Sequence, residues 1–442
     1  MNQRLLRPVG VALALSLAAL GCGRDDETSS KTTTDTGSGE SQAFIDPAAD
    51  CSDYQATEGI NGDTITVGTV RPTSGPAGIY NIVAKGIEKY FEAQNAKGGI
   101  KAGDGKQYKV VLEKGDDGYD PSRTPDVVKD LVEQKKIFAM VGEIGTAPNL
   151  AVRQYMNDKC VPSIALATGS PDWGHANEYP WYIGGLPSYA LEAHGFMQWL
   201  KKDKPDAKIA IIYQNDDFGK AFLSTVKKEI SGSKITIAGE QSYDIQGGGT
   251  TEGATTQLAA TGADVFIVAV TGTTCPQTLG FVPADWKPLT YVNITCSGKL
   301  SLALAKGRDD GVYSMQATLD PSNPDDAKNP KVQQFFTDGA AVGLTQDEME
   351  GGIVAAGWGF ASIFAKALEL SKNVTRADVM NAVYSMQKVN FGLMRDDSEA
   401  TTDGAEDPWI FEALRVVHRE GGQWNGVTEM EDFNGKSNTF VG

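Results

Sequence analysis

The sequence lacks the short motifs on which many enzyme families depend. It contains no G-x-S-x-G nucleophile elbow, no Walker-type phosphate loop, no H-E-x-x-H zinc motif and no G-x-G-x-x-G dinucleotide fingerprint. Histidine is also scarce, because only His175, His194 and His418 occur and each is isolated in the sequence. We therefore predict that the chain is not an enzyme, with no catalytic residues, no metal site and no cofactor.

Three adjacent acid pairs are the remaining candidates for chemistry of a glycosidase or cation-site type. They are Asp116-Asp117, Asp216-Asp217 and Asp309-Asp310. Each lies in a turn-like context, where aspartate is favoured because its side chain hydrogen-bonds the local backbone. We interpret all three pairs as structural, and a hydrolase on an α/β scaffold remains only a minor alternative.

Positive charge is in deficit. Lys and Arg total 40 against 57 Asp and Glu, so the formal net charge is −17. A chain this acidic is a poor partner for a phosphate backbone, and we predict no binding to nucleic acid. The composition, 40% hydrophobic and 22% charged, is typical of a soluble globular protein.

The N-terminus has a hydrophobic run too short to span a bilayer comfortably. Arg4 and Arg7 precede an apolar segment, Val9 to Leu20, and residues 1–21 are predicted to be a lipoprotein signal peptide. Ala19-Leu20-Gly21-Cys22 resembles a bacterial lipoprotein box, in which the cysteine becomes the lipidated first residue. We expect Cys22 to anchor the chain at the outer face of the bacterial cell membrane; the alternative is an ordinary signal cleaved near Ala19 and a free periplasmic protein.

Cysteines are few. Besides Cys22 there are four, Cys51, Cys160, Cys275 and Cys296, and none forms a C-x-x-C pair of the kind found in zinc sites. An even number in an exported chain predicts two disulfides, for which three connectivities are possible.

The segment after the signal is predicted to be a flexible tether, residues 22–57. It is rich in Ser, Thr, Gly and acidic residues, and it cannot bury enough apolar surface to become ordered. The remaining chain is longer than one hydrophobic core normally serves, so we expect two domains.

Two α/β units follow one another. Within residues 65–166 the apolar runs alternate with helical patterns as βαβαβαβ, and the pattern begins again after Leu186-Pro187. Such alternation predicts an α/β fold with two doubly wound parallel sheets. Near the end of the chain, helices are expected over Glu348 to Leu370 and Arg376 to Met386, and a last strand over Ile410 to His418.

The stretch from Ile137 to Trp173 is the best candidate for a ligand site. A strand from Ile137 to Val141 leads into a glycine-marked loop, and Thr146 stands where a helix N-cap is expected. A second strand, Val161 to Leu166, ends in the small-residue loop from Ala167 to Ser170. Ligands of open parallel sheets bind beyond the carboxyl ends of the strands, and the amides at a helix N-terminus suit an anion such as a carboxylate.

An ordered set of segments resembles the leucine/isoleucine/valine-binding family of solute-binding proteins for ABC importers. The resemblance runs over nearly all of residues 59–427. Its marks, in family order, are RPTSGPAG, GGI, EKGDDGYDP, VGEIGTAPNLAV, VPSIALATGSPDW, IAIIYQNDDFGKAF and GADVFIVAVTGTTCPQTL.

This resemblance implies a type I periplasmic binding protein fold, in which two lobes close on a ligand. The lobes would be residues 58–186 plus 316–393 and residues 187–315 plus 394–442. Three segments would cross between them, near Leu186-Pro187, Ser314 to Ala317, and Met394 to Trp409.

The resemblance also implies a set of ligand-binding residues. The Thr146 hydroxyl would hold the ligand carboxylate, aided by a second loop on the same lobe and by aromatic residues around the ligand. By position these residues are Tyr80, Thr146, Ala167, Thr168, Gly169, Phe218, Thr273 and Thr274. Tyr80 and Phe218 could instead be core residues.

One feature of the family is missing. Members that bind α-amino acids usually place an acid on the second lobe, but the matching loop, Asn293 to Gly298, has none. Glu143 or Asp217 could substitute, although neither is at the matching position. The expected ligand is therefore a small carboxylate-bearing solute, either a branched-chain amino acid or a related organic or aromatic acid.

We expect an extracytoplasmic binding lipoprotein that delivers this solute to the permease subunits of an ABC importer. The alternative is a receptor ectodomain of the same fold that senses the ligand and signals.

The strand assignments suggest one disulfide connectivity. Cys275 and Cys296 both lie just past strand ends of the second unit, where neighbouring parallel strands would bring them together. We hypothesise that they pair, which leaves Cys51 with Cys160.

Overall fold

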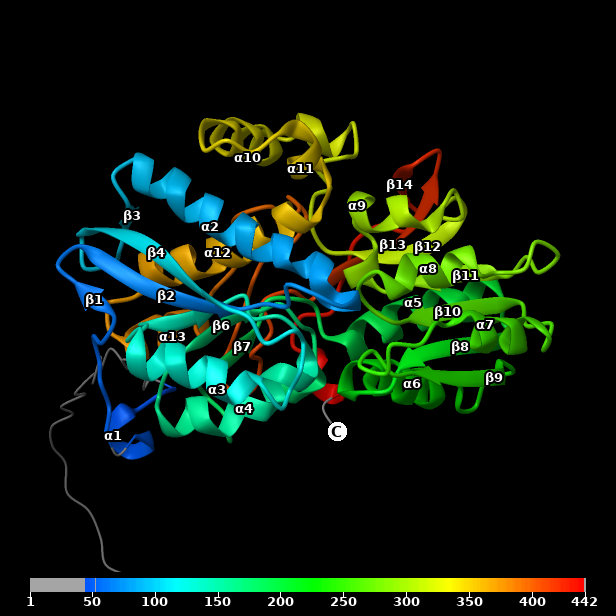
Figure 1. Cartoon of the computed structure of the whole chain (residues 1–442), viewed down its shortest axis with the longest axis horizontal. Helices are drawn as coiled ribbons and strands as arrows, with labels where there is room; N and C mark the ends of the chain where they lie inside the picture. Colours follow the sequence, from blue (N-terminus) through cyan, green and yellow to red (C-terminus); the bar gives the residue numbers. More distant parts are fainter. Residues whose placement is uncertain (1–43, 52, 441–442) are drawn as a thin grey trace, which may run out of the picture. The chain divides into compact units, whose positions relative to one another are not determined.

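The computed structural model describes residues 44–51 and 53–440, which fold around two β-sheets (Figure 1). The predicted signal peptide and the predicted lipidation residue Cys22 lie outside the described residues.

The first sheet has the strand order β3-β4-β2-β5-β6-β7, with β1 beside β2. Its parallel strands are β2 (Thr64–Val70), β4 (Gln107–Gly115), β5 (Ala139–Val141), β6 (Ser163–Leu166) and β7 (Tyr182–Gly184). The short strands β1 (Ile60–Asn61) and β3 (Ile100–Lys101) pair antiparallel. Strand β2 runs between β4 and β5, so the chain leaves it first to one side and later to the other.

The second sheet repeats this arrangement. Its order is β14-β13-β12-β11-β10-β8-β9, with β15 beside β13. The parallel strands are β8 (Lys208–Gln214), β9 (Thr236–Tyr243), β10 (Val265–Ala269), β11 (Leu289–Val292) and β12 (Val312–Gln316). The antiparallel strands are β13 (Ala413–Glu420), β14 (Gln423–Gly426) and β15 (Glu431–Asp432). The predicted α/β fold with two parallel-dominated, doubly wound sheets is confirmed.

Helices connect the strands. Those before the second sheet begins are α1 (Pro47–Asp50), η1 (Pro76–Tyr80), α2 (Asn81–Ala96), α3 (Thr124–Lys129), the π-helical turn η2 (Asp130–Gln134), α4 (Thr146–Asp158), η3 (Pro171–Gly174) and α5 (Tyr189–Asp203). The helices that connect the parallel strands of the second sheet are α6 (Asp217–Ile230), α7 (Glu252–Ala259), α8 (Thr274–Gly280), η4 (Ile294–Cys296), α9 (Lys299–Leu302) and η5 (Ala303–Ala305). The later ones are η6 (Asp326–Lys328), α10 (Pro330–Ala341), α11 (Gln346–Glu350), α12 (Ile353–Leu370), α13 (Arg376–Val383) and η7 (Ser437–Phe440).

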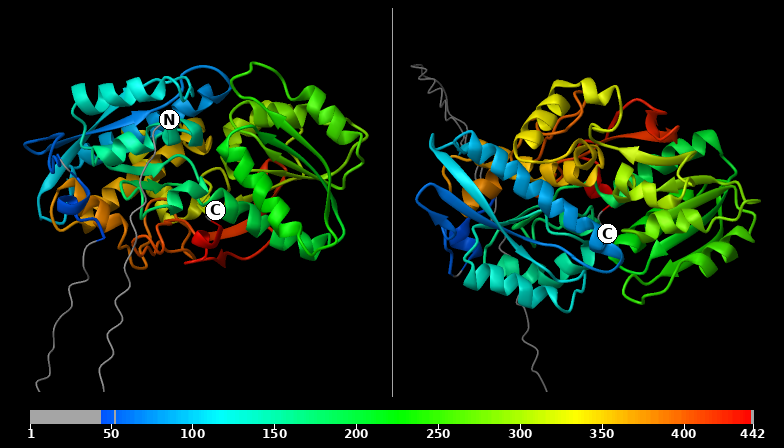
Figure 2. Two further views of the ribbon diagram at one scale, coloured as in Figure 1. Left: turned by 90° about the horizontal axis from the view of Figure 1, so that it is seen from below. Right: turned by 45° about the horizontal axis from the view of Figure 1, so that its top comes forward.

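The continuous helix predicted over Glu348 to Leu370 is wrong, because the chain turns at Gly351-Gly352 and forms α11 and α12 instead. Helix α12 is long and apolar enough to cross a membrane by composition, but 72% of it is buried inside the protein. It lies along α2 in both Figure 1 and Figure 2 and packs against β6 of the first sheet. We interpret α12 as a core helix.

Both hypothesised disulfides are confirmed. Cys275 pairs with Cys296 and Cys51 pairs with Cys160, each with a Cα–Cα distance of 6.2 Å. The first pair forms because its cysteines follow the adjacent parallel strands β10 and β11.

The end of the predicted tether is held against the first sheet's helices. Ile45 is buried and its amide donates to the Asn381 side chain at 2.8 Å, while the Tyr54 hydroxyl accepts from the Ala377 amide at 2.8 Å. Together with the Cys51–Cys160 disulfide, these contacts hold residues 44–51 and 53–57 against the fold. The prediction that the flexible tether extends to residue 57 is therefore corrected.

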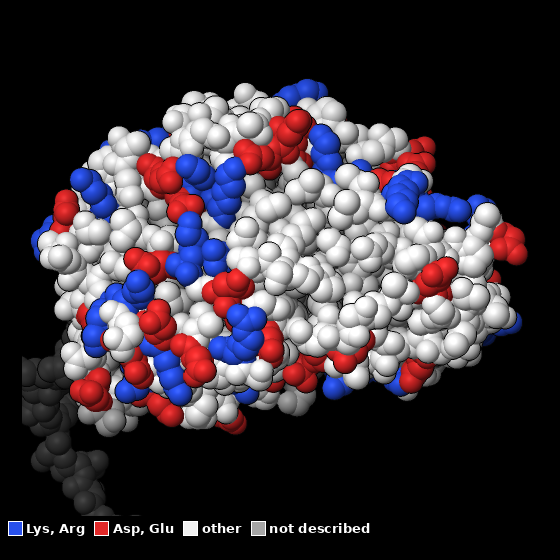
Figure 3. Space-filling model, viewed as in Figure 1, with Lys and Arg blue, Asp and Glu red and all other residues white. Residues whose placement is uncertain are grey.

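The surface carries acids and bases side by side. On the face drawn in Figure 3, Lys and Arg lie among Asp and Glu over the first sheet's helices, while much of the face near the second sheet is uncharged. Pairs such as Lys114–Glu88 at 2.7 Å and Lys97–Asp338 at 2.5 Å account for this interspersed pattern. Partly exposed pairs such as Lys114–Glu88 contribute little to stability individually.

Candidate functional site

Each sheet has a topological switch point, where the strand order reverses. In the first sheet it lies between β2 and β5, and in the second it lies between β8 and β10. Ligands of doubly wound sheets bind in the crevice beyond the carboxyl ends of these strands. The predicted residues Tyr80, Thr146, Phe218 and Thr273 follow β2, β5, β8 and β10 respectively.

A cavity of about 230 Å³ is lined by residues that follow strands of both sheets. This volume is below the roughly 300–1,000 Å³ of pockets for drug-sized molecules and suits a small solute. From the first sheet come Ile144, Gly145 and Ala167; from the second come Phe218, Thr271 and Ile294. Met315 of β12 also lines the cavity, and segments that join the two sheets complete the wall with Leu186, Pro187, Ala317, Leu319, Leu393, Met394 and Phe411.

Thr146 is not the N-cap that the sequence predicts. Helix α4 begins at Thr146 itself, and Gly145 is the N-cap with φ of 96°, a conformation that a glycine adopts without strain. A Cβ at Gly145 would also meet the ring of Tyr119. The Thr146 side chain therefore does not cap its own helix; its hydroxyl lies 2.6 Å from that of Thr168.

The two predicted loops of the first sheet lie side by side. Ile144 and Ala167 form a parallel bridge, and the Ala167 amide donates to the Glu143 carbonyl at 2.9 Å. Gly145 and Ala167 line the cavity, whereas Thr146 and Thr168, the next residue in each loop, are buried and do not line it. If Thr168 donates in the hydroxyl pair, the Thr146 proton is available to a ligand; if Thr146 donates, it is not.

The remaining residue of the second loop, Gly169, contacts the segment that runs from the first sheet into α5. Its carbonyl accepts from the Tyr189 amide at 2.7 Å. Gly169 does not line the cavity, but Tyr189 and Pro187, which lie against it, do.

Tyr80 lines the cavity and bonds loops that follow β10 and β11. Its hydroxyl accepts from the Gly272 amide at 2.9 Å and donates to the Thr295 carbonyl at 3.2 Å. The expectation of a plain core residue therefore does not describe Tyr80, which joins an element of the first sheet to two loops of the second.

Thr273 and Thr274 are close to the cavity but their hydroxyls are occupied. The Thr273 hydroxyl donates to the Pro76 carbonyl at 3.3 Å, and that of Thr274 donates to the Tyr243 hydroxyl at 3.2 Å. Neither residue lines the cavity, whereas Thr271 does. Thr271 is buried and its hydroxyl has no hydrogen-bond partner among the described residues, so it is the better candidate on this loop.

Phe218 lies in the wall as part of an aromatic cluster. It is buried, and its ring centroid lies 4.7 Å from that of Tyr189 in a T-shaped arrangement. Both predicted roles, core packing and contact with a ligand, are compatible with this position.

Tyr119 is a cavity residue that the sequence reading did not identify. It has φ of 63°, and its amide donates to the Asp117 carboxylate at 2.8 Å. Its carbonyl accepts from the Gln246 side chain at 2.6 Å, and burial raises the pKa of its hydroxyl. A bulky residue in this backbone region is strained, and such strain is common at functional sites. The turn-like sequence Asp-Asp-Gly-Tyr at residues 116–119 was the only local pattern that could have indicated this site residue.

The structure places the acids that could have replaced the missing second-lobe acid outside the cavity wall. Asp217 is exposed, whereas Glu143, which follows β5 in the chain, is buried, and this burial raises its pKa to about 8. Glu192, on α5, contacts the loop from Asn293 to Gly298, which contains no acidic residue. Its Oε1 accepts from the Ile294 amide at 2.7 Å and from the Tyr291 hydroxyl at 2.6 Å. Burial raises the Glu192 pKa to about 8 as well.

Comparison with known proteins identifies the family. A family model described as "Periplasmic binding protein" matches residues 64–414. Leu/Ile/Val-binding protein homolog 3 of Brucella melitensis is 27% identical over 205 residues, covering 46% of this chain and 53% of the relative. Homolog 7 of Brucella suis is 26% identical over 214 residues, covering 46% and 51%. The chain thus spans about half the length of the curated relatives it matches.

Solved structures share the fold. A substrate-binding protein of an ABC transporter from Aeropyrum pernix superposes with a TM-score of 0.75 at 16% identity, covering 86% of this chain and 98% of the other. A branched-chain amino acid ABC transporter protein from Thermus thermophilus, solved with bound valine, gives 0.73 at 17% identity, covering 84% and 97%. The predicted resemblance and the prediction of a binding protein instead of an enzyme are confirmed: the chain belongs to the periplasmic binding protein family, among relatives named for binding leucine, isoleucine and valine.

Proposed function

We propose that this chain is a solute-binding lipoprotein that captures a small carboxylate-bearing solute and delivers it to an ABC importer. The observation that carries the proposal is the position of the cavity, which lies at the switch points of both sheets. The segments that join the two sheets form part of its wall. An extracytoplasmic location follows from the family. The anchor at Cys22, the importer partner and the closing of two lobes are parts of the proposal.

The proposed ligand is a branched-chain amino acid or a related organic or aromatic acid. Helix α4 presents the amides of Thr146 and Ala147 ahead of its first internal hydrogen bond, from the Asn149 amide to the Gly145 carbonyl at 3.4 Å. These amides and the Thr146 hydroxyl would receive the carboxylate, helped by the helix dipole. Ala167, Thr168 and Gly169 would support this end of the ligand.

The lobes are proposed as residues 58–186 plus 316–393 and residues 187–315 plus 394–442. Hydrogen bonds from the Thr402 hydroxyl to the Val383 carbonyl at 2.6 Å, and from the Gly404 amide to the Tyr384 carbonyl at 2.9 Å, tie residues 402–404 to the end of α13. These contacts favour moving the last boundary toward Trp409. Closure would then occur by rotation about the three crossings.

The ligand proposal is tested with Thr146→Val and two probes of equal shape, 4-methylpentanoate and 4-methylpentanamide. Loss of one charge-assisted hydrogen bond should weaken carboxylate binding about 10- to 100-fold in calorimetric titration. The amide should bind the natural protein more weakly and should lose little more on the variant.

Thr255→Val is the matched control, since the Thr255 hydroxyl is buried on α7 and donates to the Thr251 carbonyl at 2.8 Å, outside the cavity wall. Equal binding of both probes to the natural protein, unaffected by Thr146→Val, would remove the carboxylate from the proposal.

The anchor is tested separately with Cys22→Ser, which should release the protein into the soluble extracytoplasmic fraction. A natural protein that is already soluble without detergent would contradict the anchor. Uptake of labelled solute in cells with and without this protein distinguishes import from the alternative, a receptor ectodomain that signals.

A further inference from the structure

The cavity wall contains one charged side chain, that of Asp320, within residues 44–51 and 53–440. All other described lining residues are apolar or neutral polar, and none is a lysine, arginine or histidine. Asp320 follows β12 in the second segment that joins the sheets. Two of its neighbours in the chain, Leu319 and Pro321, also line the cavity. The sequence did not predict Asp320 as a site residue, because Asp320 lies outside the loop from Asn293 to Gly298, where an acid was expected.

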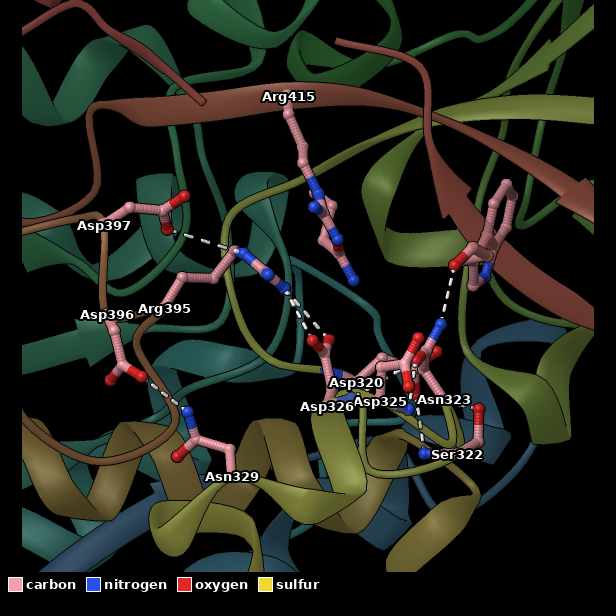
Figure 4. Close-up of polar contacts among 12 residues, drawn as sticks. Asp320, Ser322, Asn323, Asp325, Asp326, Asn329, Arg395, Asp396, Asp397 and Arg415 are labelled. Carbon is pink, nitrogen blue, oxygen red and sulfur yellow. Dashed lines mark hydrogen bonds and ion pairs between the residues drawn. The ribbon is translucent and has the colours of Figure 1, made fainter. Parts of the chain in front are cut away.

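The Asp320 carboxylate is held firmly on one side only, as Figure 4 shows. Its Oδ1 accepts from the Ser322 amide at 2.9 Å and from the Ser322 hydroxyl at 2.8 Å. The Asp320 amide donates to Asp326 at 2.9 Å, and Arg395 binds both oxygens of Asp326 at 3.1 and 2.9 Å. Asp326 is therefore neutralised by an arginine, while Asp320 is positioned by neutral donors.

The second oxygen of Asp320 has no hydrogen-bond or ion-pair partner in the described part of the chain. Burial raises the Asp320 pKa, the hydrogen bonds from Ser322 lower it, the charge of Asp326 raises it, and the charge of Arg419 lowers it. Arg419 forms its ion pair with Asp309, at 2.9 Å, and not with Asp320. Asp320 is half-buried and forms no ion pair with another described residue. Partial burial of its charge costs free energy, which a cation placed beside it in the cavity would offset.

We propose that Asp320 binds a cationic group of the solute, of the ammonium type, through its free carboxylate oxygen. This inference rests on the proposed function, because it uses the same cavity, and it narrows the ligand to one that carries a positive charge. Asp320 is then a specificity residue: it favours an amine-bearing solute over the same solute without the amine. Among the described residues, the wall holds no cationic side chain that would repel such a group.

The test compares probes that differ only in the amine. We would titrate L-leucine against 4-methylpentanoate, 6-aminohexanoate against hexanoate, and 3-methylbutylamine alone, into the full-length protein and into Asp320→Asn. Asparagine keeps an Oδ1 that can accept from Ser322, so the turn is retained while the charge is removed. In the natural protein, at least one amine-bearing probe should bind about 10- to 100-fold more tightly than its partner, and Asp320→Asn should abolish that advantage.

Asp325→Asn is the matched control, since it removes an equal charge from the same loop at a highly exposed side chain that does not line the cavity. It should preserve the advantage of the amine. Unfolding temperatures of the empty proteins report whether each variant folds, and Ser322→Ala, which loosens the turn but keeps the charge, should reduce the advantage without abolishing it.

The inference is overturned if no amine-bearing probe has an advantage in the natural protein, or if Asp320→Asn weakens both members of each pair equally, as a structural role would. Tight binding of 4-methylpentanoate and L-leucine with equal affinity would reject Asp320 and leave the proposed carboxylate site intact. Binding of 3-methylbutylamine that depends on Asp320, with no binding of either acid, would support Asp320 and reject the carboxylate site.

Discussion

The Tyr80 hydroxyl accepts a hydrogen bond from the Gly272 amide at 2.9 Å, which joins the end of η1 to the loop after β10. The same hydroxyl donates to the Thr295 carbonyl. Gly272 has φ of 62°, and a Cβ there would collide with the Pro76 carbonyl, so a residue without a side chain is required for this approach. If the two lobes move, this contact belongs to the closed form.

Tyr80→Phe should therefore destabilise the closed form by about 1–2 kcal/mol, because two hydrogen bonds are lost. We expect solute binding to weaken by about 5- to 30-fold in calorimetry, and small-angle scattering to show a larger radius of gyration in the presence of ligand. Tyr90→Phe makes the same change on α2 outside the cavity wall and should alter neither quantity. Unchanged affinity in Tyr80→Phe would show that this contact does not contribute to closure.

Arg376 stabilises the start of β5 from a buried position. It is 1% exposed, its Nε donates to the Phe138 carbonyl at 2.9 Å, and its Nη2 donates to the Ile137 carbonyl at 2.7 Å. Arg376→Met should lower the free energy of unfolding by about 3–5 kcal/mol, because it leaves buried acceptors without partners. Urea denaturation measures this loss. Arg308→Met, at an exposed position, should change stability by less than about 0.5 kcal/mol.

Glu192 should make stability dependent on pH. Its folded pKa of about 8 lies above the ordinary value of 4.5, so the folded chain retains a proton that the unfolded chain has lost between these values. The stabilisation is complete below pH 4.5, decreases as pH rises, and is lost above about 8. The slope is at most about 1.4 kcal/mol per pH unit for one group.

Glu192→Gln should remove this contribution, so the free energy of unfolding measured between pH 5 and pH 8 should fall less steeply than in the natural protein. Glu143 has a raised pKa of about 8 from the same cause, burial, and Glu143→Gln should flatten the curve in the same direction. A parallel pair of curves for the natural protein and Glu192→Gln would contradict the assignment.

The two disulfides should contribute unequally. Cys51–Cys160 closes a separation of 109 residues and Cys275–Cys296 one of 21. By loop-closure entropy the first stabilises by about 4.7 kcal/mol and the second by about 3 kcal/mol. Replacing each pair with alanines makes the same chemical change twice, so urea denaturation should show the larger loss for the Cys51 and Cys160 replacement. The opposite order would mean that contacts in the folded state, not the closed loop, set the stabilisation.

The sequence by itself determined the α/β class, the two successive units and most strand positions. The strand predicted over Val161 to Leu166 is observed as Ser163–Leu166, and the strand predicted over Ile137 to Val141 is observed as Ala139–Val141. Such elements are predictable because their periodicity and turn residues are local properties of the chain. The Cys275–Cys296 pair followed too, since neighbouring strand ends place these cysteines at one edge of a sheet, and Cys51–Cys160 was the pair that remained.

Only the tertiary structure decided how the site is built. Thr146 bonds to Thr168 instead of capping its helix, Thr271 faces the cavity in place of Thr273 and Thr274, and Asp320 enters the wall from a connecting segment. Each depends on residues far apart in the sequence whose distance is set by packing between elements, and a hydroxyl or carboxylate responds to whichever partner lies within about 3 Å. Local patterns carry no information on that distance, so they located the loops of the site but not the atoms that face the ligand.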